Sequence, residues 1–141
     1  MPNELPPTID PVAAARWAAL ALPAPGAQPD GAAGSPWLHE EVARRMEERL
    51  GWITLRPQRW AHWEPVRGGL QAHALLTRRY PDAQCFVVEP GVERSKLAIE
   101  NMSKPWWSPA RWKAAPQRFE APPAAGVQMV WANMLLHHAA D

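Results

Sequence analysis

The sequence is poor in several features, and each scarcity excludes a class of protein. Cysteine occurs once, at Cys85, so no disulfide framework can form, and we expect a reducing, cytoplasmic location. The formal net charge is only +1, which argues against general binding to nucleic acid or membrane surfaces. No apolar run approaches the ~20 residues of a membrane-spanning helix. The 141 residues are enough for one domain with a hydrophobic core.

Spacings typical of a metal site are also missing. His62, His73, His137 and His138 occur without an H-x₃-H or C-x₂-C pattern, and adjacent histidines at a strand end point apart. We therefore expect no metal site. His62 and His73 are interpreted as packing or surface groups, and Cys85 as a small buried residue that is inert as a nucleophile.

The first part of the chain differs in composition from the rest. Residues 1–34 are rich in Pro, Ala and Gly and are predicted to form a flexible N-terminal segment. One helical piece is predicted within it, at Asp10–Leu22, with Trp17 and Leu20 as anchors. Residues 35–141 are predicted to form the folded domain.

That domain is predicted to open with an amphipathic helix. Ser35 is the expected N-cap and Pro36 the first helical residue. Apolar residues repeat every four positions, at Leu38, Val42, Met46 and Leu50. Glu40/Arg44 and Glu41/Arg45 are expected to form ion pairs on the solvent-exposed side. We expect the helix to pack on a sheet; covering a cofactor pocket is the alternative.

The next stretch has the order strand, glycine turn, helix, strand, acid. The segments are a strand at Trp60–Trp63, a turn at Gly68-Gly69, a helix at Leu70–Tyr80, a buried strand at Cys85–Val88, and Glu89. Glu89 follows Gly69 by 20 residues (89 − 69). This separation is typical of a βαβ nucleotide site, where glycines let the backbone approach the ligand and an acid binds the ribose hydroxyls.

Two further strands complete the predicted fold. A helix at Val92–Met102, with Ile99 and Met102 inward, precedes a short third strand closed by Phe119-Glu120 and a fourth strand at Val127–Ala132. The fold class expected is α/β, a partial doubly wound, Rossmann-like and mostly parallel sheet that is truncated after the fourth strand. The Gly68-Gly69 turn, Glu89 and Asn133 would then meet at the carboxyl ends of the strands.

The segment Lys104–Arg118 interleaves four basic residues with three tryptophans and contains no acid. It is interpreted as an ordered loop whose tryptophans pack on the domain. An acidic protein partner is the second interpretation, because complementary charge steers such contacts. Stacking on single-stranded nucleic acid is the least favoured of the three.

Three stretches resemble a known family. EEVARRMEERLGWITLRP, LLTRRYPDAQCFVVEP and VQMVWANMLLHH, within residues 35–141, are similar to the N-terminal part of class I S-adenosylmethionine-dependent methyltransferases. More narrowly, they resemble the malonyl-acyl-carrier-protein O-methyltransferase group of biotin synthesis. The resemblance implies methyl transfer to the carboxylate of an acyl-carrier-bound substrate, and Lys104–Arg118 as the surface for an acidic acyl carrier protein.

The resemblance also implies roles for individual residues. Glu89 would bind the ribose hydroxyls of S-adenosylmethionine, and Gly68 with Gly69 would pass under its amino-acid part. Glu64 would match the acid at the end of the first strand, and Asn133 would lie near the methionine portion. It implies no general base, so the catalytic residues are unknown.

Two departures from the family define an alternative. The family's first loop reads acid-x-Gly-x-Gly-x-Gly, whereas this chain reads Glu64-Pro65-Val66-Arg67-Gly68-Gly69, with only Gly68 on a family glycine. The alternative is a degenerate methyltransferase-like interaction domain without cofactor or activity. The family's sheet also has seven strands, so we expect Val127–Ala132 to form an apolar edge that self-associates or pairs with a second half.

Overall fold

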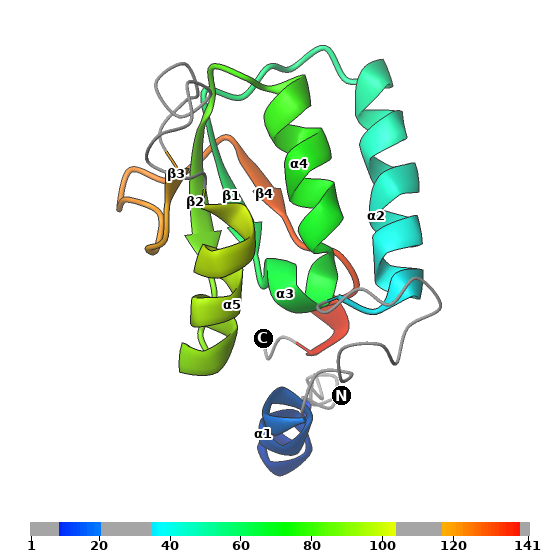
Figure 1. Ribbon diagram of the computed structural model, residues 1–141, viewed down its shortest axis with the longest axis vertical. Helices are drawn as coiled ribbons and strands as arrows, with labels where there is room; N and C mark the ends of the chain where they lie inside the picture. Colours follow the sequence, from blue (N-terminus) through cyan, green and yellow to red (C-terminus); the bar gives the residue numbers. More distant parts are fainter. Residues whose placement is uncertain (1–8, 21–34, 104–116, 139–141) are drawn as a thin grey trace, which may run out of the picture.

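The computed structural model describes residues 9–20, 35–103 and 117–138. Its centre is a four-stranded, all-parallel sheet of order β3-β2-β1-β4 (Figure 1). The strands are β1 (Arg59–Trp63), β2 (Gln84–Val88), β3 (Gln117–Arg118) and β4 (Met129–Trp131). The expected α/β fold with a parallel sheet is therefore confirmed, and the arrangement is consistent with a partial Rossmann-like fold. The third strand precedes its predicted position, and the fourth is shorter than Val127–Ala132.

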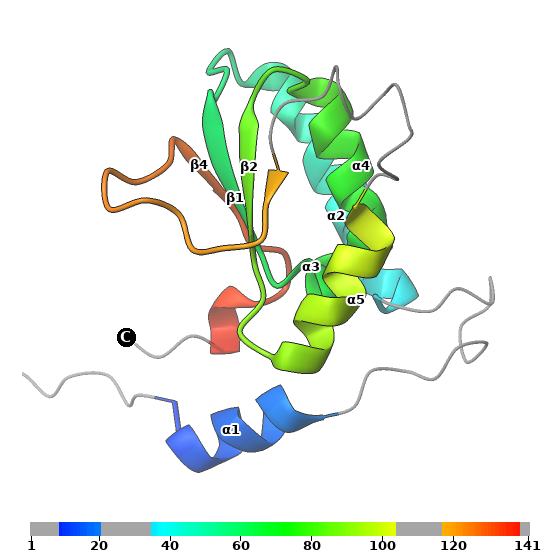
Figure 2. The ribbon, with the colours of Figure 1, turned by 60° about the vertical axis from the view of Figure 1, so that its left-hand side comes forward.

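Helices lie between β1 and β2 and directly after β2, whereas the connection from β3 to β4 contains no helix. The described helices are α1 (Pro11–Ala19), α2 (Trp37–Arg49), α3 (Pro65–Gly68), α4 (Leu70–Arg79) and α5 (Val92–Met102), with 3₁₀ turns η1 (Leu50–Trp52) and η2 (Leu136–His138). The helix predicted between the first two strands is α4. Figure 2 shows α2, α4 and α5 on one face of the sheet and the β3–β4 connection on the other.

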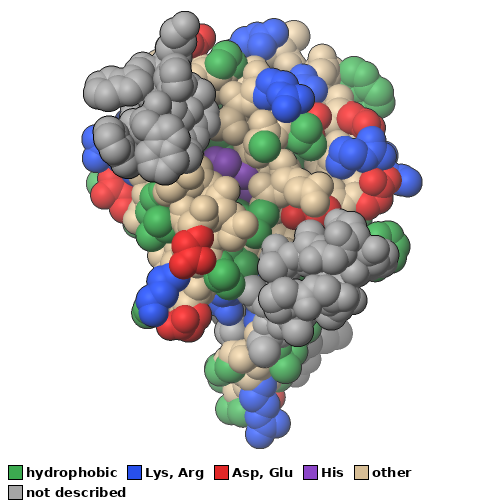
Figure 3. Space-filling view, in the orientation of Figure 1, with side chains coloured by type: hydrophobic (Ala, Val, Ile, Leu, Met, Phe, Trp, Pro, Cys, Tyr) green, Lys and Arg blue, Asp and Glu red, His purple; other side chains and the backbone are tan. Residues whose placement is uncertain are grey.

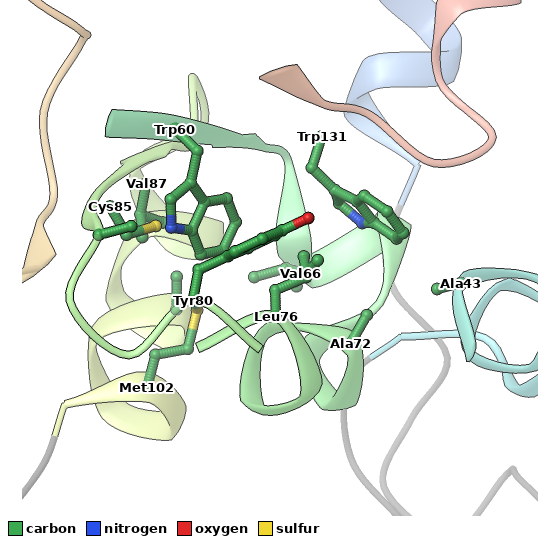
Figure 4. Packing of buried hydrophobic residues seen from close by; sticks show 12 residues of the cluster. Ala43, Trp60, Val66, Ala72, Leu76, Tyr80, Cys85, Val87, Met102 and Trp131 are labelled. Carbon is green, nitrogen blue, oxygen red and sulfur yellow. The ribbon is translucent and has the colours of Figure 1, made fainter. Parts of the chain in front are cut away.

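The core lies between that helical layer and the sheet. Trp60 and Leu76 are fully buried and pack with Tyr80, Cys85 and Val87, as Figure 4 shows. Because side chains alternate along a strand, Trp60 faces the helices, whereas its neighbour Ala61 faces the other side of the sheet. Cys85 is 2% exposed, and burial raises the pKa of its thiol. Its prediction as a small buried core residue is confirmed.

Helix α2 is where the sequence prediction was least accurate. Leu38, predicted to face the core, is 46% exposed, whereas Ala43 is completely buried. Met46 and Leu50 pack against the core as partly buried side chains. The helix is rotated toward Ala43 because that small residue allows α2 to approach the α3–α4 junction closely: a Cβ at Gly69 would lie 3.2 Å from the Ala43 Cβ.

The predicted polar contacts of this helix are also partly wrong. The N-cap of α2 is Pro36, not Ser35, whose hydroxyl instead bridges to α3 and α4. Glu40 does not pair with Arg44, because its carboxylate accepts hydrogen bonds from the Gln71 backbone N–H. The Glu41–Arg45 pair is confirmed at 2.7 Å.

Two other predictions concern the ends of the chain and α5. Met102 is buried as predicted, but Ile99 is 42% exposed and Ala98 takes the inward position. The helix predicted within Asp10–Leu22 is confirmed as α1; residues 1–8 and 21–34 lie outside the described residues. The segment Lys104–Arg118 also falls outside them, apart from Gln117 and Arg118, which form β3.

Candidate functional site

The candidate site is the carboxyl edge of the sheet between β1 and β4. From β1 the chain crosses to β2 and β3 on one side, whereas β4 pairs with β1 on the other, so the strand order reverses there. Ligands of open α/β sheets bind at such a reversal, outside the carboxyl ends of the strands. Glu64 directly follows β1, Glu89 directly follows β2, and Asn133 follows β4. The structure therefore brings the predicted acid positions and Asn133 to one edge.

Unusual backbone conformations flank this reversal. Glu64 has φ 46° and Met134 has φ 57°, and these are the positive-φ non-glycine residues in the described part of the chain. The left-handed conformation costs a non-glycine residue roughly 1–2 kcal/mol. Strain of this kind concentrates at ligand sites and switch regions. Its position after β1 and after β4 supports this edge as the functional one.

The predicted open glycine turn is not present as such. The chain forms the one-turn helix α3 after Glu64, and Gly68 is its last residue. A Cβ at Gly68 would lie 3.2 Å from the Asn133 carbonyl oxygen, and one at Gly69, whose φ is +136°, would lie 3.0 Å from Glu40 Oε2. In this structure the two glycines thus allow close approach of protein atoms. Their role under a cofactor stays a prediction.

Three residues at the start of α2 bind the backbone of the α3–α4 junction, and we call Ser35, His39 and Glu40 the α2 clamp. The Ser35 hydroxyl donates to the Pro65 carbonyl at 3.1 Å and accepts from the Leu70 N–H at 2.9 Å. His39 Nδ1 donates to the Arg67 carbonyl at 2.7 Å. Sequence reasoning missed the clamp, because its partners lie about thirty residues away and no local spacing reveals them.

Glu89 reaches back from the end of β2 to the connection that follows β1. Its side chain is 2% exposed. Oε1 accepts from the Val66 N–H at 2.8 Å, and Oε2 accepts from Arg94 Nε at 3.4 Å. Burial raises the pKa of Glu89, and the bond from the Val66 N–H and the charge of Arg94 partly oppose that rise.

Arg94 links the two acids of the edge. Its Nη2 lies 3.9 Å from Glu64 Oε2, while its Nε contacts Glu89. Its side chain is 13% exposed, so this pairing is less screened than a surface ion pair. Sequence reasoning missed Arg94, because one arginine in a charged helix carries no distinguishing pattern.

Asn133 contributes an acceptor without a partner. Its Nδ2 donates to the His39 carbonyl at 2.8 Å and to the Gly68 carbonyl. Both neighbours are acceptors, so the amide nitrogen must face them and the orientation of the group is fixed. Its Oδ1 is buried and has no hydrogen-bond partner among the described residues. A buried acceptor without a hydrogen-bond partner destabilises the folded state by about 1–3 kcal/mol. A ligand that donates a hydrogen bond to Asn133 Oδ1 would remove this cost.

Arg67 carries the other cation of the edge and was also missed from the sequence. The residue is 6% exposed, and its guanidinium donates from Nη1 to the Trp17 carbonyl at 2.9 Å and from Nη2 to the Leu20 carbonyl at 2.7 Å. The guanidinium carbon lies 5.2 Å from the centre of the Trp17 ring. These contacts hold α1 at the carboxyl-end side of the sheet, beside α3 and η2 (Figures 1 and 2).

A pair of buried histidines lies between β1 and α4. The His62 and His73 rings stack with centroids 5.4 Å apart, and their Nδ1 atoms are 3.2 Å apart. Full burial of His62 lowers the pKa of its imidazole well below the usual value, and His73 adds to that effect. Both residues are packing groups in this structure. No cluster of three His, Cys, Asp or Glu side chains suited to a metal occurs in the described residues.

The surface and the helices add two observations. Figure 3 shows acidic and basic side chains interspersed on the face that carries α2 and α4, without a continuous area of one sign among the coloured residues. Within the described ranges, none of the helices has the length and apolar character needed to cross a bilayer.

Comparison of this chain with protein-family models, with curated proteins and with solved structures found no match.

Proposed function

We propose that this chain binds S-adenosylmethionine at the carboxyl edge of its sheet and is the cofactor-binding part of a methyltransferase. The observation that supports this most is the contact between Glu89 and the Val66 N–H, 2.8 Å long. It joins the acid after β2 to the connection after β1, the two components that an adenosyl site requires. Acyl-carrier-bound carboxylates of biotin synthesis are the acceptors that the sequence resemblance favours.

The polar groups of the edge suit such a ligand. Glu89 would accept hydrogen bonds from the ribose hydroxyls, with Arg94 displaced from its long 3.4 Å contact. The unpartnered Asn133 Oδ1 and the Glu64 carboxylate would accept from the ammonium of the amino-acid part. Bound there, the sulfonium supplies an electrophilic methyl group. A carboxylate acceptor is already anionic, so the chain's residues need only position the reactants and exclude water.

Isothermal titration calorimetry with S-adenosylmethionine and S-adenosylhomocysteine tests the proposal. Glu89→Gln retains an acceptor for the Val66 N–H but loses the charge, and we expect its dissociation constant to rise about tenfold or more. Glu93→Gln is the matched control, because Glu93 lies four residues along with a side chain 82% exposed. Equal affinities for the two variants would remove Glu89 from the site.

A second candidate function is the degenerate interaction domain without a cofactor. The observation that favours it is the α2 clamp, because Ser35 and Glu40 already bind the Leu70 and Gln71 N–H groups at the start of α4. Those N–H groups are the ones that commonly bind anionic ligands. If a folded chain releases or absorbs no heat when titrated with S-adenosylmethionine or S-adenosylhomocysteine, the result would favour this second candidate.

The partner proposal concerns Lys104–Arg118. Docking of an acidic acyl carrier protein there would weaken with salt and would be lost in Arg111→Glu/Lys113→Glu, because it depends on complementary charge. Binding that is unchanged by salt and by the double substitution would argue against it. Arg78→Glu, on the exposed side of α4, is the control for a general change of charge.

A further inference from the structure

The inference concerns Arg67 and the end of α1 that it holds. Trp17 and Leu20 close the carboxyl end of α1, and their carbonyl oxygens accept from Nη1 and Nη2 of one guanidinium. Carbonyls at this end of a helix carry partial negative charge. Arg67 therefore binds two oxygen acceptors of a negatively polarised group through its two terminal nitrogens.

Apolar burial contributes little to this docking. Val12 is 56% exposed, Leu20 is 54% exposed and Trp17 is 38% exposed. Figure 2 shows α1 below the carboxyl ends of the strands, set apart from the helical layer. The hydrogen bonds and the ring contact of Arg67 therefore carry a large part of the interaction, and α1 can leave without exposing the core.

We propose that Arg67 is a carboxylate-binding residue, and that the end of α1 occupies its site as an internal substitute for the ligand. The two terminal nitrogens of an arginine grip both oxygens of a carboxylate, which is the geometry that makes this pairing strong. A carboxylate at Arg67 and the docked α1 exclude each other. The amino-acid carboxylate of S-adenosylmethionine is the ligand considered, and this identification rests on the proposed function.

The surrounding charges favour a carboxylate over a phosphate. Burial and the charge of Arg94 lower the pKa of the Arg67 guanidinium, whereas the charges of Glu64 and Glu89 raise it. Two cations and two anions leave the edge close to neutral. A doubly charged phosphate would meet both acids, whereas a singly charged carboxylate meets less repulsion for the same bidentate contact. Inorganic phosphate therefore serves as a negative probe.

We call the contact between Arg67 and the end of α1 the latch. The first experiment tests the latch in the full chain without ligand. Trypsin cleavage after Arg16, which lies within α1, is followed by mass spectrometry, because cleavage requires α1 to open. Arg67→Gln is expected to cleave about fivefold faster at this bond or more, since the docked helix is released. Arg78→Gln, exposed on α4, is the control and is expected to match the unsubstituted chain.

A second variant covers the case in which Arg67→Gln fails to fold. Trp17→Ala removes the ring over the guanidinium from an exposed helix, so the core is untouched. Because Trp17 directly follows the cleaved bond, the rate is normalised to that of a short peptide with the same substitution, and the normalised cleavage after Arg16 is again expected to accelerate. Unchanged cleavage in both folded variants would overturn the latch.

The ligand experiment adds S-adenosylmethionine, acetate and phosphate separately to the unsubstituted chain. We expect the two carboxylates to accelerate cleavage after Arg16, phosphate to have no effect, and Arg67→Gln to show no response. If S-adenosylmethionine binds by calorimetry but cleavage after Arg16 is unchanged or slower, the ligand and the docked α1 do not exclude each other, and the proposal is wrong. If it does not bind, the proposed function fails and acetate alone decides: acceleration supports Arg67 as a carboxylate site, and no change overturns it.

Discussion

At the scale of single residues, the buried histidine pair makes stability depend on pH. The folded chain holds the pKa of His62 well below its usual value, so the folded state resists a proton that the unfolded chain accepts near pH 6.5. The unfolding free energy should therefore be full above that pH and fall as the pH drops through it, by at most about 1.4 kcal/mol per pH unit for one group.

Urea denaturation at pH 7.5 and pH 5.5 measures this effect. The comparison with His62→Phe isolates it, because Glu89, whose pKa is raised by burial, changes stability in the opposite direction in both chains. We expect the substituted chain to lose less stability between the two pH values. Equal losses would show that the pair does not control the acid response.

Gly69 makes a second prediction at this scale. Its φ of +136° disfavours any side chain, and a Cβ would lie 3.0 Å from Glu40 Oε2 and 3.2 Å from the Ala43 Cβ. Gly69→Ala should cost about 2 kcal/mol or more, from backbone strain and overpacking together. Gly51→Ala is the control, because the nearest atom to its Cβ position, in the Arg79 side chain, is 3.8 Å away. Thermal unfolding of both variants measures this difference. Equal midpoint temperatures would contradict the close packing of Gly69 against α2.

At the scale of secondary-structure elements, sequence patterns predicted the units whose signals are local. The strands around Trp60 and Phe86 and the helix between them were found close to their predicted bounds, because apolar runs, turn residues and helix formers act over a few positions. The orientation of α2 was not predictable in this way. Its buried residue is Ala43, selected by the absence of a side chain at Gly69, far along the chain.

For the candidate site too, features with a local sequence signal were predicted and long-range contacts were missed. The spacing of Gly69 and Glu89 predicted that they follow two neighbouring parallel strands, and the structure confirms that β1 and β2 pair in parallel. Arg67 and Arg94 were missed, because a charged side chain gives no periodic signal and its partner is set by three-dimensional proximity. The αL conformation of Glu64 was equally hidden, since nothing in Glu64-Pro65 predicts a positive φ.

Helix α4 provides the prediction at this scale. Its N-cap, Gly69, has no side chain, and the Ser35 hydroxyl accepts from the Leu70 N–H in its place. Ser35→Ala should therefore cost about 1–2 kcal/mol, as the loss of an N-cap does, although Ser35 is remote from α4 in sequence. Ser103→Ala, at an exposed position beyond α5, is the control in chemical denaturation. A cost no larger than the control's would show that water replaces the hydroxyl.

At the scale of the whole molecule, β4 is an edge strand of the sheet that the described residues form. β4 pairs with β1 and is the last strand in the described order, and Val130 is 60% exposed. An apolar edge of this kind promotes strand pairing between chains. The predicted apolar edge at Val127–Ala132 has its structural premise here, and self-association stays a prediction.

Light scattering at roughly tens of micromolar chain tests that association. We expect a mass above that of one chain, reduced by Val130→Lys because a lysine on the edge opposes pairing. Val92→Lys is the control, at a site on α5 that is 72% exposed and remote from the edge. A monodisperse monomer in the unsubstituted protein would rule out pairing through β4.

The α2 clamp has a kinetic consequence for the molecule. The first amides of a helix ordinarily exchange quickly with solvent deuterium, because no carbonyl of the helix protects them. In α4 the Leu70 and Gln71 amides are held by Ser35 and Glu40, so their protection lasts only as long as the first turn of α2 stays closed. Fraying at the start of α2 and opening at the start of α4 should thus be one cooperative event, with a shared exchange rate that joins segments thirty residues apart.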